Sequence, residues 1–185
     1  MLTNGIIIAQ TKKWITDVVV GCNFCPFAAR ELKRGSIQYQ VIQSAERKDV
    51  LEALAQAFNE LDANKKIETT ILILPNGFDK FSNYLQLAEL AESLLKKEGY
   101  EGIYQVAGFH PQYIFAGSSG DDPANYTNRS PYPMLHLLRE ESLSLAIDNY
   151  PGTENIPQKN IEYANAKGLA YMQLLREACM AEAVK

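Results

Sequence analysis

The sequence has little of what several protein classes depend on. It contains no long run of lysine or arginine, and its formal net charge at pH 7 is only −4. Binding to nucleic-acid phosphates normally requires a broad basic surface, so we expect no nucleic-acid partner. The apolar run at residues 6–9 is too short for a signal-peptide core, and Lys12 and Lys13 follow it without a small-residue cleavage site. We also expect no membrane association.

Cysteine and histidine are scarce, with three and two residues respectively. An odd and small number of cysteines suits a reducing compartment rather than a disulfide framework, which predicts a cytoplasmic protein. Hydrophobic residues make up 46% of the chain, enough for one core. Because no internal repeat or low-complexity tract divides it, the chain is expected to form a single domain over residues 1–185.

The common catalytic signatures are missing as well. There is no phosphate-binding loop with its lysine, no GxSxG elbow, no HExxH pair and no GxGxxG sequence after a predicted strand. These absences exclude the enzyme classes that a short motif identifies. Any site must therefore be argued from residue types and their placement.

Hydrophobic periodicity predicts alternating helices and strands. Residues 47–63 carry apolar side chains at three- and four-residue steps, and residues 69–74 form the continuous apolar run of a central strand. Further helices are expected at about residues 6–20, 26–34, 82–97, 134–148 and 157–183, and further strands at residues 36–43 and 103–109. Two successive strand–helix–strand units favour an α/β fold with a mainly parallel sheet of three or more strands, covering helices and extra C-terminal helices. A ferredoxin-like α+β sheet is the alternative.

Polar chemistry is concentrated at residues 109–140, FHPQYIFAGSSGDDPANYTNRSPYPMLHLLRE. This segment holds both histidines, the adjacent Asp121 and Asp122, and two arginines, while its aromatic residues argue against disorder. A long loop inside a compact domain is usually functional, so the segment is the first candidate for a site.

The spacing of Cys22 and Cys25 is that of a CxxC pair. A thiol-redox site would need a preceding strand and a supporting βαβ unit, for which the chain before Cys22 is too short. A zinc site would use Cys22, Cys25, His110 and His136, but the gap between the histidines matches no compact finger. Burial of Cys25 as a packing residue at a helix start is the third interpretation.

Three motifs together carry a resemblance to a known family. They are GCNFCPFA at residues 21–28, FHP at residues 109–111 and NRSPYP at residues 128–133, with an Asp pair between the last two. The chain resembles, from about Trp14 to Leu175, the bacterial domain-of-unknown-function family fourteen-fifteen, in which the position of Cys22 is commonly aliphatic. The resemblance implies no reaction or cofactor. It implies that equivalent places are occupied by Cys25, His110, Asp121, Asp122, Asn128, Arg129, His136, Arg139 and Glu140.

The types of these residues suggest roles. On a helix beginning near residue 133, His136, Arg139 and Glu140 would share one face. Asp121 and Asp122, after the flexible residues 117–120, are expected either to hold a cation or act as a base, or to cap backbone amides. The candidate catalytic residues are His110, His136, Asp121, Asp122 and Cys25. The candidate substrate-binding residues are Asn128, Arg129, Ser130, Arg139 and Glu140.

Two functions compete on this basis. The first is a small-molecule enzyme, a hydrolase or group transferase, that acts without a required cofactor on an anionic metabolite bound by Arg129 in a pocket beyond the third strand. The second is a non-catalytic binding protein or assembly subunit, in which residues 109–140 dock onto a partner or a second copy of the chain. The first requires the imidazoles, a carboxylate and Arg129 to meet in one hollow.

Overall fold

Two amphipathic helices cover one face of the central sheet. The structure, a computed structural model, describes residues 2–181, and in it α3 (Arg47–Ala63) and α4 (Phe81–Lys97) both bury their apolar stripes. These bounds confirm the helices predicted at residues 47–63 and 82–97. The core on this side contains Leu54, Phe58, Leu61, Leu87, Leu72 and Leu135.

The sheet has four strands in the order β1-β2-β4-β3, namely β1 (Ile37–Val41), β2 (Thr69–Ile73), β4 (Met134–Arg139) and β3 (Tyr104–Phe109). β2 is buried at every residue, as its continuous apolar sequence predicts. β1 and β2 are parallel, whereas β4 lies antiparallel between β2 and β3. The α/β class is confirmed, but within residues 2–181 only the β1–β2 pair is parallel.

The departure from a mainly parallel sheet has one cause. Residues 134–139 were expected to begin a helix and instead form β4, which is inserted between two strands that would otherwise be neighbours. Its side chains alternate, so Leu135 and Leu137 join the core under α3 and α4, while Met134 joins the core on the other face. The expected shared helical face of His136, Arg139 and Glu140 is therefore wrong.

The opposite face of the sheet is covered by the two ends of the chain. They contribute α1 (Asn4–Trp14), its continuation η1 (Ile15–Val20), a π-helix, and α6 (Ile156–Lys167) with α7 (Leu169–Ala181). The long helix expected at residues 157–183 is interrupted at Gly168, whose φ of 79° a helix cannot continue through; its expected end at residue 183 lies outside the described residues. The short α2 (Ala28–Arg34) ends at Gly35 in the left-handed conformation.

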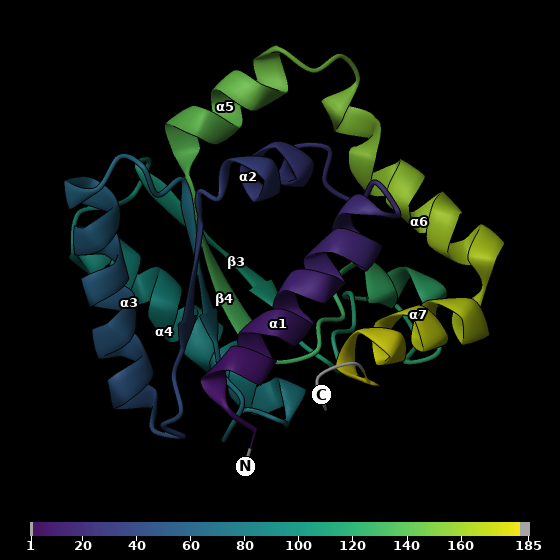
Figure 1. The fold of residues 1–185 in the computed structure, drawn as a ribbon, viewed down its shortest axis with the longest axis horizontal. Helices are drawn as coiled ribbons and strands as arrows, with labels where there is room; N and C mark the ends of the chain where they lie inside the picture. The colour runs from purple at the N-terminus through teal and green to yellow at the C-terminus, as the bar shows by residue number, and fades with distance from the viewer. Residues whose placement is uncertain (1, 182–185) are drawn as a thin grey trace.

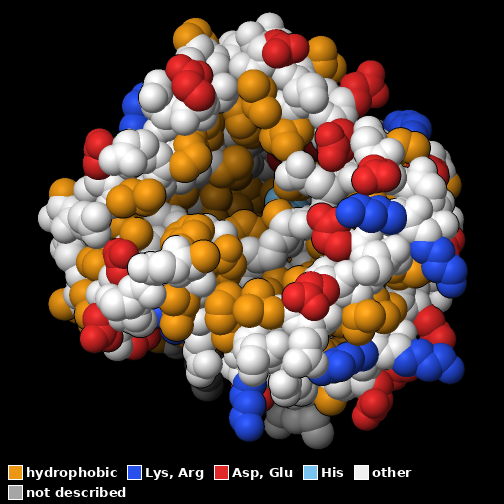
Figure 2. Space-filling model, turned by 180° about the vertical axis from the view of Figure 1, so that it is seen from behind, with side chains coloured by type: hydrophobic (Ala, Val, Ile, Leu, Met, Phe, Trp, Pro, Cys, Tyr) orange, Lys and Arg blue, Asp and Glu red, His pale blue; other side chains and the backbone are white. Residues whose placement is uncertain are grey.

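A bridge of chain stands away from this body (Figure 1). It comprises α5 (Glu140–Asp148) and the short η3 (Thr153–Asn155), and we call residues 140–155 the arch. No residue of α5 is buried, and Leu145 is 56% exposed. Seen from behind, the molecule has a deep hollow with a largely apolar interior (Figure 2). Among the described residues, no helix is both long and apolar enough to cross a membrane.

Candidate functional site

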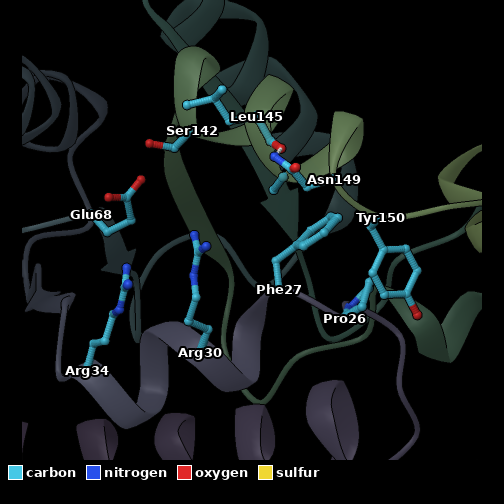
Figure 3. A pocket seen from close by; sticks show the side chains of 10 residues that line it. Pro26, Phe27, Arg30, Arg34, Glu68, Ser142, Leu145, Asn149 and Tyr150 are labelled. Carbon is cyan, nitrogen blue, oxygen red and sulfur yellow. Dashed lines mark hydrogen bonds between the residues drawn. The ribbon is translucent and has the colours of Figure 1, made fainter.

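A cleft separates α2 from α5. Its volume is about 470 Å³, within the usual range for small-molecule sites. Side chains of α2 and of the arch line it from opposite sides (Figure 3), and the two meet at its edge, where Phe27 contacts Tyr150. The residues that line it are Pro26, Phe27, Arg30, Arg34, Glu68, Ser142, Leu145, Ala146, Asn149 and Tyr150.

Two cationic side chains enter this cleft from α2. Arg30 and Arg34 are one helical turn apart and extend from the same side of the helix (Figure 3). Nε of Arg30 lies 2.5 Å from Oε1 of Glu31, and Nη1 of Arg34 lies 4.0 Å from the same oxygen. The side chains of Arg30 and Arg34 are 53% and 62% exposed, so both retain hydrogen-bond donors that a ligand can reach.

Glu31 fixes the charge balance beneath the arginines. Burial alone would raise the pKa of its carboxyl, but hydrogen bonds from Ser36 and Arg30 and the charges of Arg30 and Arg34 outweigh it, and the pKa lies below its usual value. The Ser36 hydroxyl donates to Oε2 at 2.6 Å. Glu31 is therefore ionised at neutral pH and neutralises about one of the two guanidinium charges.

The other half of the cleft is aromatic. Phe27 and Tyr150 meet edge to face with their ring centroids 5.8 Å apart, and they stand on the side of the cleft away from Arg34 (Figure 3). Leu145 projects above them from α5, and so does Asn149, the residue that follows this helix. The cleft thus has a charged end and an apolar end.

A small inner cavity of about 60 Å³ extends the cleft toward the sheet. It shares Phe27, Arg30 and Glu68 with the cleft and reaches Thr69 on β2 and Leu138 on β4. Its lining is almost wholly apolar. This places the cleft next to the part of the sheet that carries His136.

His136 is half-buried on the face of the sheet that α1 partly covers. It pairs with the half-buried Ala107 in the strand register, and Phe109, on the same face of β3, packs against Trp14 of α1. Of the two histidines, only His136 keeps part of its surface accessible, since His110 is 0% exposed.

The protonation of His136 follows from its partner Thr69. The single hydroxyl proton of Thr69 goes to the carbonyl oxygen of Leu137, so this hydroxyl accepts from Nε2 of His136 at 2.6 Å. Burial lowers the pKa of His136 to about 4. At neutral pH the ring is uncharged, with its proton on Nε2 and an acceptor at Nδ1.

His110 has a structural environment. Its Nδ1 accepts from the backbone N–H of Gln112 at 2.9 Å, so Nε2 carries the proton and donates to the carbonyl of Phe78 at 2.8 Å. Phe81 and Tyr84 pack on the ring, and burial lowers its pKa. Both ring nitrogens are occupied by backbone groups, and the ring does not reach solvent.

The acidic pair and its neighbours organise the loop itself. Asp122 caps η2 (Pro123–Thr127), accepting from the N–H of Ala124 at 2.9 Å and from the hydroxyl of Ser118 at 2.9 Å. Asp121 is exposed. Asn128 accepts from Thr127 at 3.2 Å, and the buried hydroxyl of Ser130 donates to the carbonyl of Tyr132. Asp122 therefore takes the capping role that was one of the two expectations for the aspartates.

Both arginines predicted to bind substrate donate hydrogen bonds to backbone carbonyl groups. Arg129 donates to the carbonyls of Tyr113 at 3.0 Å and Gly120 at 2.9 Å. Arg139 donates to the carbonyl of Leu61 at 2.6 Å, on the α3 side of the sheet, which is the face opposite His136. Glu140, half-buried, begins α5 and lines a separate shallow cavity beside β3.

The two cysteines of the CxxC pair differ in environment. Cys22 is buried, and burial raises the pKa of its thiol, opposed by a hydrogen bond with Tyr163. Cys25 is half-buried in the loop before α2, next to Pro26 of the cleft. Within residues 2–181 no group of three or more His, Cys, Asp or Glu side chains is placed to hold a metal ion, so the zinc set is not assembled.

The sequence contained a partial signal for the cleft. Arginines four residues apart on a predicted helix indicate a shared face, and Glu68 precedes a buried strand directly. Neither pattern shows what lies opposite. The partner helix α5 was expected as the second half of a longer helix, and its position over α2 depends on β4 being a strand.

Fold and site together define the class of protein: an α/β domain with a small-molecule-sized cleft beneath a helical arch. The model of the family described as "protein of unknown function (DUF1415)" matches residues 6–174, and the chain belongs to this family. No curated protein and no solved structure matches the chain significantly.

Proposed function

We propose that the protein binds a small anionic molecule with an apolar portion in the cleft between α2 and α5. One observation supports this above all: two incompletely paired guanidinium groups and an aromatic wall face the same cavity. Guanidinium donors match carboxylate or phosphate oxygens, and the aromatic end can bury the remainder of the ligand.

A catalytic function is the second candidate, and His136 supports it. An uncharged imidazole with its Nδ1 free to accept can take a proton from a molecule held in the inner cavity beside Thr69, although a pKa of about 4 makes it a weak general base. Hydrolysis or group transfer would centre on His136, since His110, Asp122 and Arg129 are engaged with the backbone and with neighbouring side chains. Docking of residues 109–140 onto a partner stays a prediction.

Calorimetric titration with two matched probes tests the binding proposal. 3-Phenylpropanoate and 3-phenylpropan-1-ol share an aromatic body and differ in charge, so we expect saturable binding of the acid alone. Arg30→Gln and Arg34→Gln should each raise its Kd about tenfold, the weight of a charge-assisted hydrogen bond.

The matched control is Arg47→Gln. Arg47 lies on α3, where it donates to Gln86 at 2.6 Å, and its replacement should leave the Kd unchanged. Unfolding midpoints of the unliganded variants establish that each is folded. Equal binding of the alcohol, or an equal loss in the Arg47 variant, would overturn the proposal.

A further inference from the structure

Glu68 occupies an unusual position in the cleft. It lies directly before β2 and is half-buried, and its carboxylate points into the cavity on the side where Arg30 and Arg34 enter (Figure 3). Its backbone N–H donates to Ser36, but among residues 2–181 its side chain has neither an ion-pair partner nor a hydrogen-bond donor. A carboxylate is thus left available to a ligand inside the cleft.

The charges that line the cleft indicate that its ligand carries a positive group as well as a negative one. Glu31 already neutralises about one of the two arginines, and Glu68 offsets the other. A simple anion would be attracted by Arg30 and Arg34 and repelled by Glu68. A ligand that also places a positive group beside Glu68 would be attracted by the arginines and by the carboxylate.

We propose that the cleft recognises a zwitterion, an inference that rests on the binding function proposed above. The ligand's acid group contacts Arg30 and Arg34, its ammonium group contacts Glu68, and its apolar side chain lies against Phe27 and Tyr150. An α-amino acid with an apolar or aromatic side chain has this layout.

The spatial order of the lining residues supports the assignment. Glu68 and both arginines are gathered at one end of the cleft, and Phe27 and Tyr150 form the other (Figure 3). The two charged groups of an α-amino acid are attached to one carbon, so they must be recognised at neighbouring positions, with the side chain directed away. Ser142, projecting from α5 toward Glu68, adds a hydroxyl at the charged end.

Three probes with the same aromatic body separate the possibilities by calorimetry at pH 7.5. L-Phenylalanine carries both charges, 3-phenylpropanoate only the acid and phenethylamine only the amine. We expect L-phenylalanine to bind at least about tenfold more tightly than either. Glu68→Gln should remove that advantage for L-phenylalanine and leave 3-phenylpropanoate binding as tightly as before or more tightly. Glu92→Gln, on α4 and outside the cleft, is the matched control.

The outcomes distinguish this inference from the binding function. If 3-phenylpropanoate binds as tightly as L-phenylalanine and Glu68→Gln affects neither, the zwitterion is refuted while anion binding stands. If Glu68→Gln strengthens both acids equally, Glu68 only competes for the arginines and the inference also fails. If neither acid binds the folded wild type, both proposals fall together.

Discussion

Arginine, histidine and aspartate are the residue types that catalysis uses, and they are also the types that form hydrogen bonds to buried backbone groups. In this protein several of them have the second role. Arg129 is the clearest example, because its donors serve two loop carbonyls while its guanidinium lies 4.7 Å from the ring centroid of Tyr126. The buried carbonyl groups of a long loop packed against the rest of the protein need hydrogen-bond donors. One arginine can supply donors to several of them. The polar residues between β3 and β4, residues 110–133, therefore form an internally bonded loop.

His136 makes stability depend on pH. Its pKa is about 4 in the folded protein and about 6.5 when exposed, so the unfolded state binds more protons between these values. The free energy of unfolding should therefore fall as the pH is lowered through this window. Between pH 7 and pH 5 the contribution of His136 is about 2 kcal/mol. Urea denaturation at both pH values measures it.

The matched variant for this measurement is His136→Gln, whose amide can still donate to Thr69. The pKa of His110 is also lowered by burial, so the variant should retain some pH dependence but lose about 2 kcal/mol less than the wild type between pH 7 and pH 5. Equal losses in the two proteins would contradict the account of His136 as a buried neutral imidazole.

The sequence predicts which residues could form the site, but not how they are arranged in space. Residue types singled out His136 and its neighbours as candidates, since these side chains can carry chemistry wherever they are placed. They did not indicate that Arg139 faces away from His136, because alternation along a strand replaces helical periodicity there. The pairing of Arg30, Arg34 and Glu68 across a cleft depends on tertiary structure alone.

At the scale of elements, periodicity succeeded where it was long and unambiguous. α3 has the predicted bounds of residues 47–63 because its apolar stripe extends over more than four turns. The helix prediction for residues 134–139 was wrong because Leu135, Leu137 and Leu138 fit a buried strand as well as a helix. Six residues are too few to distinguish the two periodicities. The strand following the loop is set by pairing with β2 and β3.

The break between α6 and α7 gives a prediction at this scale. Gly168 has φ 79° and ψ 162°, a conformation that L-residues rarely adopt, so Gly168→Ala should lower the free energy of unfolding by about 1–3 kcal/mol. No atom lies within 4 Å of the added Cβ, so the loss would come from the backbone. Chemical denaturation measures it.

Gly5→Ala is the counterpart within α1. Its added Cβ meets only an ordinary contact at 3.9 Å, and alanine in a helix should stabilise by about 0.5–1 kcal/mol. Opposite signs for the two substitutions would locate the strain at the helix junction. A neutral or stabilising Gly168→Ala would mean that α6 and α7 can join as one helix.

At the scale of the whole molecule, stability is unevenly distributed. α3 buries Val50, Leu54, Ala57, Phe58 and Leu61, whereas α5 buries no residue and exposes Leu145 and Ile147. The arch is therefore held by its ends, and the cleft beneath it is bordered by the least packed helix of the described chain. A ligand in the cleft would supply the packing that α5 lacks.

Amide hydrogen exchange followed by mass spectrometry examines this arrangement directly. In the unliganded protein, peptides covering residues 140–148 should exchange at least about a hundredfold faster than peptides covering residues 47–63, because opening α5 exposes little buried surface. Saturation with L-phenylalanine should slow exchange in α5 and α2 and leave α3 unchanged, since both helices line the cleft and α3 does not. Equal protection of α5 and α3 without ligand would mean that the arch is packed on the body and that the cleft closes in solution; slowing confined to other segments would place the ligand elsewhere.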